Sequence, residues 1–141
     1  MRRLFFISIL CLVALSFAGC DKVYVNGVLD GQWKLLSVEK AGIVEQPAVM
    51  ITYSFQRHTM LLALHHDEEL PYRYIGEFDH SDGFLYTSGF VRFPGVSAEC
   101  YPEELERYYI YRENEKFKVE RLDEDMLVMS TTDRIYRLRK W

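Results

Sequence analysis

Apolar side chains recur at every second position through most of the chain, and this period constrains the fold more than any other feature. From Asp30 onward they fall in runs of about five to nine residues, separated by glycine, proline, asparagine or charged clusters. Alternation at period two is typical of strands with one buried and one exposed face. Helical periodicity is scarce, so the sequence predicts an all-β domain over residues 30–141.

The pattern predicts eight or nine strands joined mainly by short turns. Four linkers, at 56–58, 81–83, 113–116 and 123–125, are polar and of hairpin length. Sequential strands are therefore expected to pair as antiparallel neighbours. The predicted strands are Gln32–Glu39, Met50–Phe55, Thr59–His65, Tyr72–Phe78, Phe84–Phe90, Tyr108–Arg112, Phe117–Arg121, Met126–Ser130 and Arg134–Arg139.

A meander of this kind leaves two exposed edges unless it closes on itself. We expect closure into an up-and-down β-barrel of eight to nine strands, with an interior that side chains fill or that holds one small ligand. A sandwich of two sheets is the alternative, less favoured because hairpin-length turns suit a simple meander. Placing Trp33 inside defines the inward-facing set as Trp33, Leu35, Tyr53, Phe55, Met60, Leu62, Leu64, Tyr72, Tyr74, Phe117, Val119, Leu127, Met129, Tyr136 and Leu138.

Residues 91–107 form the longest irregular insertion in this meander. Pro94-Gly95 breaks any strand, and Pro102 followed by two acids predicts a short helical turn near 102–107. The acidic run at 103–106 is expected on a solvated face.

The first 19 residues have the organisation of a secretory signal peptide. Two arginines precede an apolar run over residues 4–18, which is shorter than the about 20 residues of a membrane-spanning helix. The sequence FAGC at 17–20 resembles the lipobox of bacterial lipoproteins, in which the cysteine is acylated and becomes the new N-terminus; a plain secretory signal is the alternative. The resemblance implies lipidation at Cys20, a tether over residues 20–29, and a lipid-anchored protein of the cell envelope, with the outer membrane as the expected location.

Removing residues 1–19, which carry two arginines and no acids, leaves 122 residues with 15 basic and 21 acidic side chains, a formal charge of −6. That length suits one domain. Nucleic acids call for clustered cations, so no nucleic-acid partner is expected. Of the three cysteines, only Cys100 remains outside the signal and the lipidation site. No intrachain disulfide is therefore expected, and a small buried apolar role is favoured for Cys100.

Two stretches are similar to the lipocalin-like (calycin-type) lipoprotein domains of bacteria. The first, LDGQWKLLSVE at 29–39, contains the Gly-x-Trp pattern of these barrels as Gly31 and Trp33. The second is the ending FKVERLDEDMLVMSTTDRIYRLRKW at 117–141. The resemblance implies a barrel floor made by Gly31 and Trp33, with an arginine of the last strand, Arg137 or Arg139, packed on the indole.

No group of residues predicts catalysis or a metal site. The run His65-His66-Asp67-Glu68-Glu69 is metal-capable, but adjacent histidines on a strand point to opposite faces, which favours a solvated turn. The sequence has no nucleophile elbow, phosphate loop or zinc-protease motif. We therefore expect no catalytic residues, no metal and no cofactor, and a protein that is not an enzyme.

Ten tyrosines are the one unusual feature of the composition, and they suit two functions. In the preferred hypothesis, a barrel mouth lined by Tyr53, Leu62, Tyr72 and Tyr74 holds a small apolar or amphipathic ligand. In the second, the barrel is filled by its own aromatic side chains, and its outer surface, particularly 91–107, binds another envelope protein.

Overall fold

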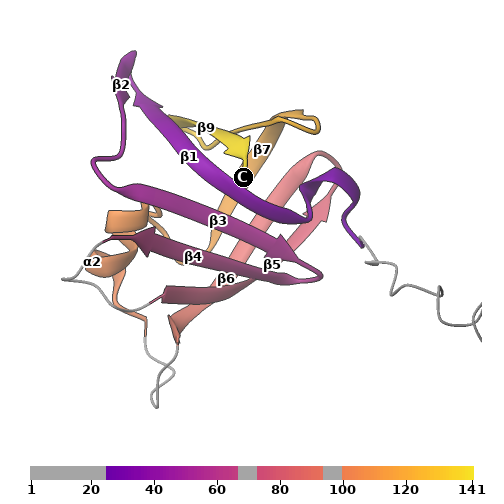
Figure 1. The fold of residues 1–141 in the computed structure, drawn as a ribbon, viewed down its shortest axis with the longest axis horizontal. Coiled ribbons are helices and arrows are strands. Elements are labelled where there is room, and N and C mark those ends of the chain that lie inside the picture. The colour runs from indigo at the N-terminus through magenta and orange to yellow at the C-terminus, as the bar shows by residue number, and fades with distance from the viewer. Residues whose placement is uncertain (1–24, 67–72, 94–99) are drawn as a thin grey trace, which may run out of the picture.

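The computed structural model describes residues 25–66, 73–93 and 100–141. In these ranges nine strands form one antiparallel sheet in the order β2-β1-β3-β4-β5-β6-β7-β8-β9. Strand β1 also pairs with β9, so the meander closes into a ring and β2 is a short branch on β1 (Figure 1). The predicted all-β, up-and-down arrangement is confirmed, and the sandwich alternative is wrong.

The strand bounds lie within three residues of the predicted ones wherever a strand was predicted and found. The elements are η1 (Gly27–Leu29), β1 (Gly31–Lys40), β2 (Ile43–Glu45), β3 (Met50–Gln56), β4 (Thr59–His65), β5 (Arg73–Ser81), β6 (Phe84–Phe93), α2 (Pro102–Leu105), η2 (Glu106–Tyr108), β7 (Glu115–Leu122), β8 (Met126–Ser130) and β9 (Arg134–Lys140), where η denotes a 3-10 turn.

Three local features differ from the prediction. The strand expected over 108–112 is wrong, because Tyr108 ends η2 and Tyr109 has left-handed backbone with a φ of 62°, which interrupts any extended run. Strand β2 was not predicted, since three residues are too few to show an alternation. Residues 27–29, expected in the tether, form η1 instead, and Leu29 is fully buried. The helical turn expected near 102–107 is confirmed as α2 and η2.

Alternation along the strands places one side chain of every two inside the ring. Every described member of the predicted inward set is buried except Leu64 and Val119, which pack partly against the core. Register shifts in β1, β6 and β7 are bulges, and such bulges add the local bend that a closed sheet needs. The core is completed from outside the strands by Leu29 at one end and by Leu105, Tyr108 and Ile110 at the other.

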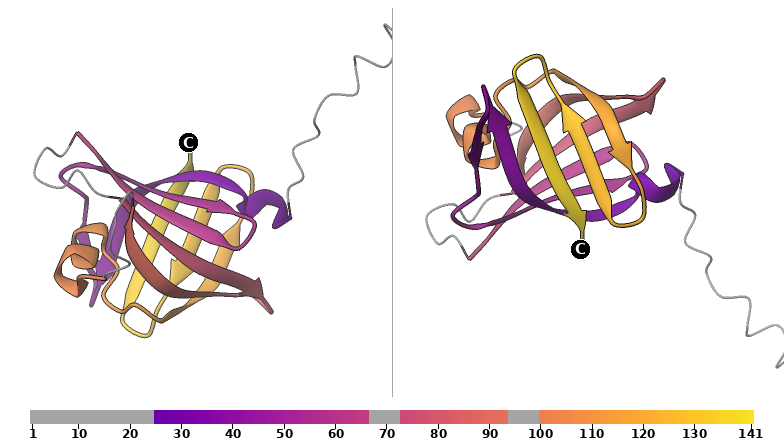
Figure 2. Two further views of the ribbon diagram at one scale, coloured as in Figure 1. Left: turned by 90° about the horizontal axis from the view of Figure 1, so that it is seen from below. Right: turned by 90° about the horizontal axis from the view of Figure 1, so that it is seen from above.

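The two helical parts of the molecule lie at opposite ends of the ring. Figures 1 and 2 show η1, the indigo turn, at one end and α2 at the other. We call the η1 end the closed end and the α2 end the mouth. The two ends are closed in different ways, and this difference locates the candidate site.

Candidate functional site

The closed end is built around Trp33, whose side chain is fully buried. Its indole Nε1 donates a hydrogen bond of 2.9 Å to the carbonyl of Leu29 in η1. Trp33 lies directly opposite Lys140 in the pairing of β1 with β9, and Lys140 Nζ is 4.4 Å from the centroid of the indole ring. The cation on the tryptophan is therefore a lysine of the last strand.

The prediction that Arg137 or Arg139 packs on the indole is wrong. Side chains alternate along β9, so that the buried Tyr136 and Leu138 share the inner face with Lys140. The two arginines point outward: Arg137 pairs with Glu39 at 2.9 Å, and Arg139 is exposed. A shift of one residue in a strand exchanges its two faces, which is the error made here.

Lys140 also explains the glycine beside the tryptophan. Lys140 Nζ donates to the carbonyls of Val28 (2.7 Å) and Asp30 (2.6 Å), which joins the last strand to the start of the first. A Cβ at Gly31 would lie 3.1 Å from this nitrogen, and Gly31 has a φ of +120°. Both facts favour glycine at this position. Burial lowers the pKa of Lys140.

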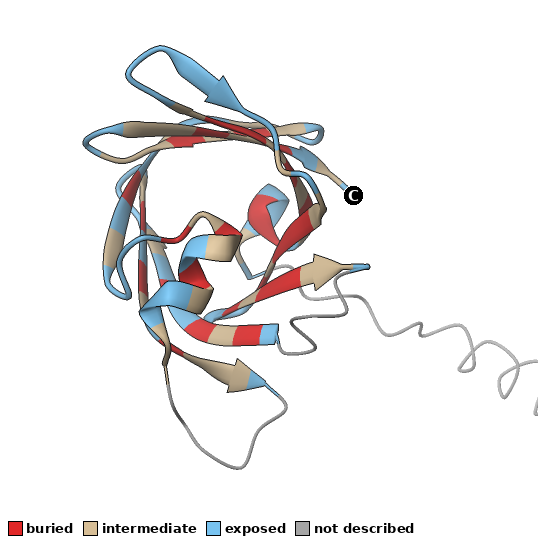
Figure 3. Ribbon diagram, turned by 90° about the vertical axis from the view of Figure 1, so that its left-hand side faces the viewer, coloured by how far each residue is buried: buried red, intermediate tan, exposed pale blue. Residues whose placement is uncertain are grey.

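The mouth is covered by a stretch that belongs to no strand, residues 101–110, which we call the cap segment. Figure 3 looks toward this end and shows the helical turns of the cap segment across the opening of the ring. Leu105, Tyr108 and Ile110 are buried at 1% exposure or less, so this segment contributes side chains to the core of the ring.

Two tyrosine hydroxyls from the ring hold the backbone of the cap segment. Tyr53 donates to the carbonyl of Tyr108, and Tyr136 donates to the carbonyl of Tyr109 at 2.9 Å. The aromatic ring of Tyr74 also packs edge to face against that of Tyr108, with the two ring centroids 5.8 Å apart. Burial raises the pKa of both Tyr53 and Tyr136, so these phenols stay protonated donors at neutral pH.

The structure brings together three of the four residues predicted to line a cavity. Tyr53 is paired with Leu62, and Leu62 with Tyr74, on the neighbouring strands β3, β4 and β5. All three are fully buried and face the interior of the ring, and both tyrosines contact the cap segment. Tyr72 lies outside the described residues.

A charged group joins the cap segment to the ring at the same place. Arg92 Nε donates to Glu104 Oε2 at 2.9 Å, Arg92 Nη2 bonds Glu104 Oε1, and the Tyr74 hydroxyl donates to Glu104 Oε2. The side chains of Arg92 and Glu104 are only 23% and 17% exposed. The guanidinium also stacks on Tyr101, 3.8 Å from the ring centroid. We call Tyr74, Arg92 and Glu104 the mouth triad.

The ionisation of the mouth triad follows from these contacts. The hydrogen bond from Arg92, and secondly that from Tyr74, lowers the pKa of Glu104 below its ordinary value, so Glu104 is a carboxylate at neutral pH. Burial, and secondly the bond to Glu104, raises the pKa of Tyr74 to about 12. The expectation that the acids at 103–106 are all solvated is wrong for Glu104, and nothing in the local sequence indicated Arg92.

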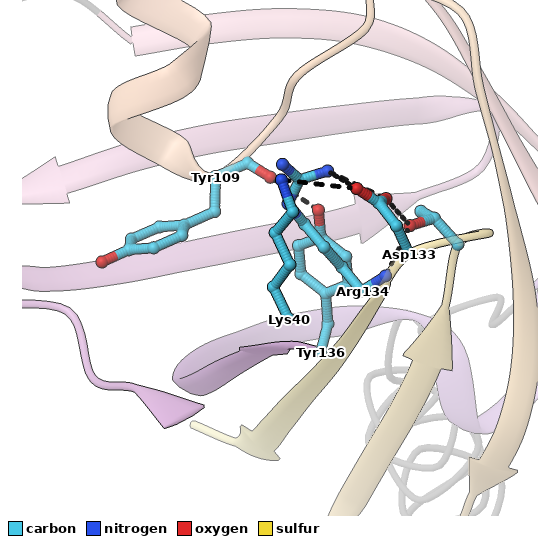
Figure 4. Close-up of polar contacts among 6 residues, drawn as sticks. Lys40, Tyr109, Asp133, Arg134 and Tyr136 are labelled. Atoms are coloured by element: carbon cyan, nitrogen blue, oxygen red, sulfur yellow. Dashed lines mark hydrogen bonds and ion pairs between the residues drawn. The ribbon is translucent and has the colours of Figure 1, made fainter. Parts of the chain in front are cut away.

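The outer side of the cap segment touches the strand hairpins on either side. Tyr109 donates to Glu45 of β2 at 2.6 Å, and the guanidinium of Arg134 stacks on Tyr111, the residue directly after the cap segment, at 3.8 Å from the centroid of its aromatic ring. Arg134 in turn bonds Asp133, which also lies 3.7 Å from Lys40 (Figure 4). Among the described residues, these contacts between the cap segment and the strands all involve side chains.

The other chemical candidates are reported for the described ranges. There, no cluster of three or more histidine, cysteine, aspartate or glutamate side chains could hold a metal ion, and no helix is long and apolar enough to cross a membrane. His65 contacts Thr52 Oγ1 at 2.9 Å, while 67–69 lie outside the described residues. Cys100 is partly buried against the core, and burial raises the pKa of its thiol.

Comparison with known proteins identifies the family. Residues 13–141 match the family described as "lipocalin-like domain", and the chain belongs to this family. A lipocalin-like protein from Bacteroides uniformis ATCC 8492 has a similar structure, with a TM-score of 0.64 and 19% identity over 82% of this chain and 100% of the other. An uncharacterized protein from Bacteroides eggerthii DSM 20697 is also similar, with a TM-score of 0.62 and 18% identity over 80% and 99% of the two chains. No curated protein matches the chain.

Proposed function

We propose that this protein is a lipid-anchored, non-enzymatic protein of the cell envelope that takes up a small apolar or amphipathic ligand between its ring and its cap segment. The observation that carries the proposal is the closure of the mouth by a segment that side chains hold in place. A closure of this kind can separate from the ring without breaking the pairing of any strand. The lipocalin-like fold, a ring around one interior, supports the same function.

If the cap segment separates from the ring of strands, the inner surface that it uncovers is suited to an amphipathic molecule. Leu105, Tyr108 and Ile110 occupy the space above Tyr53 and Tyr74, and an apolar chain could replace them there. The hydroxyls of Tyr53 and Tyr74 would then need new acceptors, because a buried donor without a partner is unfavourable.

Ligand uptake is tested with a soluble form, residues 21–141, which contains every described element. The neutral fluorescent probe N-phenyl-1-naphthylamine is expected to bind it saturably, at one site. Leu105→Ala should tighten this binding, because the loss of its buried contacts weakens the attachment of the cap segment to the ring and so favours the open mouth. Leu127→Ala deletes the same group from an equally buried site on β8 and should not tighten it. Probe binding that never saturates, or that tightens equally in both variants, would contradict this function.

The lipid anchor is tested in cells by Cys20→Ala. Acylation gives two or three chains at one residue, and more than one chain is needed for stable attachment. The variant should therefore leave the membrane fraction as a soluble form or accumulate as an uncleaved precursor. A processed protein that stays with the membranes would contradict the anchor but not ligand uptake.

A protein-binding role is the second candidate, and one observation favours it. Ile43 and Val44 are 75% and 55% exposed on β2, which has a single neighbour among the described strands. Exposed apolar residues on a strand edge are typical of sites where another chain adds. In vivo cross-linking to a second envelope protein that Val44→Lys abolishes, without saturable probe binding by residues 21–141, would favour this role over ligand uptake.

A further inference from the structure

The ring carries a guanidinium and a phenol side by side at its mouth. Tyr74 and Arg92 are direct cross-strand partners on β5 and β6, so their positions are fixed by the pairing of the sheet. Residues opposite each other in an antiparallel pair have side chains on the same face. Tyr74 is fully buried and next to Leu62 on the inner wall, so both donors lie at the inner edge of the mouth.

The group bound by these two donors is a carboxylate supplied by the cap segment. Glu104 receives two hydrogen bonds from Arg92 and one from Tyr74. Arg92 contacts both carboxylate oxygens, which is the fork geometry in which a guanidinium binds a carboxylate most strongly. Glu104 does not belong to the ring, because α2 reaches the mouth from a separate part of the chain. The ring therefore holds a site for a carboxylate that a detachable segment occupies.

Separation of the cap segment would leave this site in need of another anion. Arg92 and Tyr74 are largely covered, and a largely buried guanidinium that loses the carboxylate bonded to it is strongly unfavourable. The wall below them is apolar and aromatic, formed by Leu62 and Tyr53. A molecule with a carboxylate at one end and an apolar chain behind it would replace both Glu104 and the apolar side chains of the cap segment.

The charges around the site favour a single negative charge. Arg92 is the cation that the ring contributes, and one guanidinium balances one carboxylate. Glu103, Glu106 and Arg107, whose charge also lowers the pKa of Glu104, belong to the cap segment and would leave the site with it. A dianionic head group such as a phosphate monoester would carry a second negative charge that this guanidinium does not balance, whereas a monocarboxylate carries only one.

We propose that Tyr74 and Arg92 form the head-group site for an amphipathic monocarboxylate, and that Glu104 fills this site when no ligand is bound. The inference rests on the proposed uptake of a ligand under the cap segment and names the chemical class of that ligand. Glu104 is thus an internal competitor, and weakening its bond should strengthen ligand binding.

The test compares laurate with its uncharged methyl ester, each displacing N-phenyl-1-naphthylamine from residues 21–141. Arg92→Met is expected to weaken laurate about tenfold or more, as loss of a charged hydrogen bond does, and to leave methyl laurate nearly unchanged. Glu104→Gln should tighten laurate about tenfold, because an amide competes less well for a guanidinium than a carboxylate does. Glu106→Gln removes the same charge from an exposed neighbour and should change laurate binding little.

Thermal unfolding of each protein shows whether the variant is folded. A further variant tests the same site with a smaller change. Tyr74→Phe keeps the ring and removes only the hydroxyl, so it should weaken laurate by a smaller factor than Arg92→Met. Equal affinity of laurate and methyl laurate, with no effect of Glu104→Gln on either in folded protein, would overturn the head-group site and leave ligand uptake intact. Failure of the probe and of both laurate compounds to bind would overturn both proposals.

Discussion

The two ends of the ring are closed by different means. At the closed end, Trp33 is the strand-pairing neighbour of Lys140 and lies four positions from Leu29, and Lys140 joins β9 to the start of β1 through backbone carbonyls. At the mouth, the closing residues come from a segment that no strand pairing among the described residues holds, and its contacts include tyrosine hydroxyls, an ion pair and buried apolar side chains. From this comparison we predict that the closed end unfolds only with the whole ring and that the mouth opens by itself.

The two ends also differ in what their partly buried cations contact. Lys140 at the closed end donates to backbone carbonyls, which have fixed positions. Arg92 at the mouth bonds a side-chain carboxylate that another carboxylate could replace. A cation that contacts only backbone and an indole has a structural role, while one that contacts an exchangeable anion is suited to binding.

The largest expected effect is at the closed end. Trp33→Ala should lower the free energy of unfolding by about 3–5 kcal/mol, because it removes a fully buried indole and leaves a cavity. Trp141→Ala is the control, since this second tryptophan is 60% exposed and should cost little. Urea unfolding of both variants measures the difference. Equal losses would show that the buried indole does not stabilise the closed end.

A smaller loss is expected from the cation over the indole. Lys140→Met should cost about 1–3 kcal/mol, because two backbone carbonyls lose their donor and the contact with the indole is lost. Arg139→Met, one residue away on the outer face, should cost close to nothing. In a double-mutant cycle, part of the Lys140 loss should disappear in the Trp33→Ala background. Fully additive losses would mean that the lysine and the tryptophan have no favourable interaction free energy.

The closed end was largely predictable because its signals are local. The period of two predicted the ring strands, and Gly31 and Trp33 are two positions apart on a single strand. The error concerned only which residue of the last strand reaches the indole. That choice depends on the register between β1 and β9, which are about a hundred residues apart in the chain, and on the bulge between Leu35 and Ser37 in β1. Sequence patterns do not record a register of this kind.

The mouth was less predictable because its contacts depend on where an irregular segment lies. The alternation correctly predicted that Tyr53, Leu62 and Tyr74 face inward, and their pairing places them together. It did not indicate that Leu105, Tyr108 and Ile110 enter the ring, because a short turn has no period to reveal its buried face. Glu104 shows the same problem, since an acid among acids is usually solvated and only its contact with Arg92 distinguishes it.

At the mouth, the loss of one hydroxyl should loosen the cap segment rather than the ring. Tyr53→Phe removes a buried hydrogen bond to the cap segment, worth about 0.5–1.5 kcal/mol. Amide hydrogen exchange is therefore expected to accelerate in the cap segment while the amides of β1 and β9 are unchanged, because local opening needs less free energy than global unfolding. Tyr86→Phe changes a 40% exposed tyrosine on the outer face and serves as the control. Equal acceleration throughout the ring would show that the mouth does not open independently.

The smallest expected effect is a dependence of local stability on pH, which should appear at the mouth and not at the closed end. Because Arg92 and Tyr74 lower the pKa of Glu104, the folded protein binds a proton there less readily than the unfolded chain does. The stabilisation of the cap segment is then fully present above the ordinary glutamate pKa of 4.5 and is lost as the pH falls through the lower value in the folded protein. Hydrogen exchange measured from pH 6 to pH 3, corrected for the intrinsic rate, should show the cap segment losing protection before the amides near Trp33. Glu104→Gln should remove the pH dependence of this protection, and Glu106→Gln should keep it. If the cap segment of the wild-type protein is equally protected across this pH range, the mouth triad does not hold it closed.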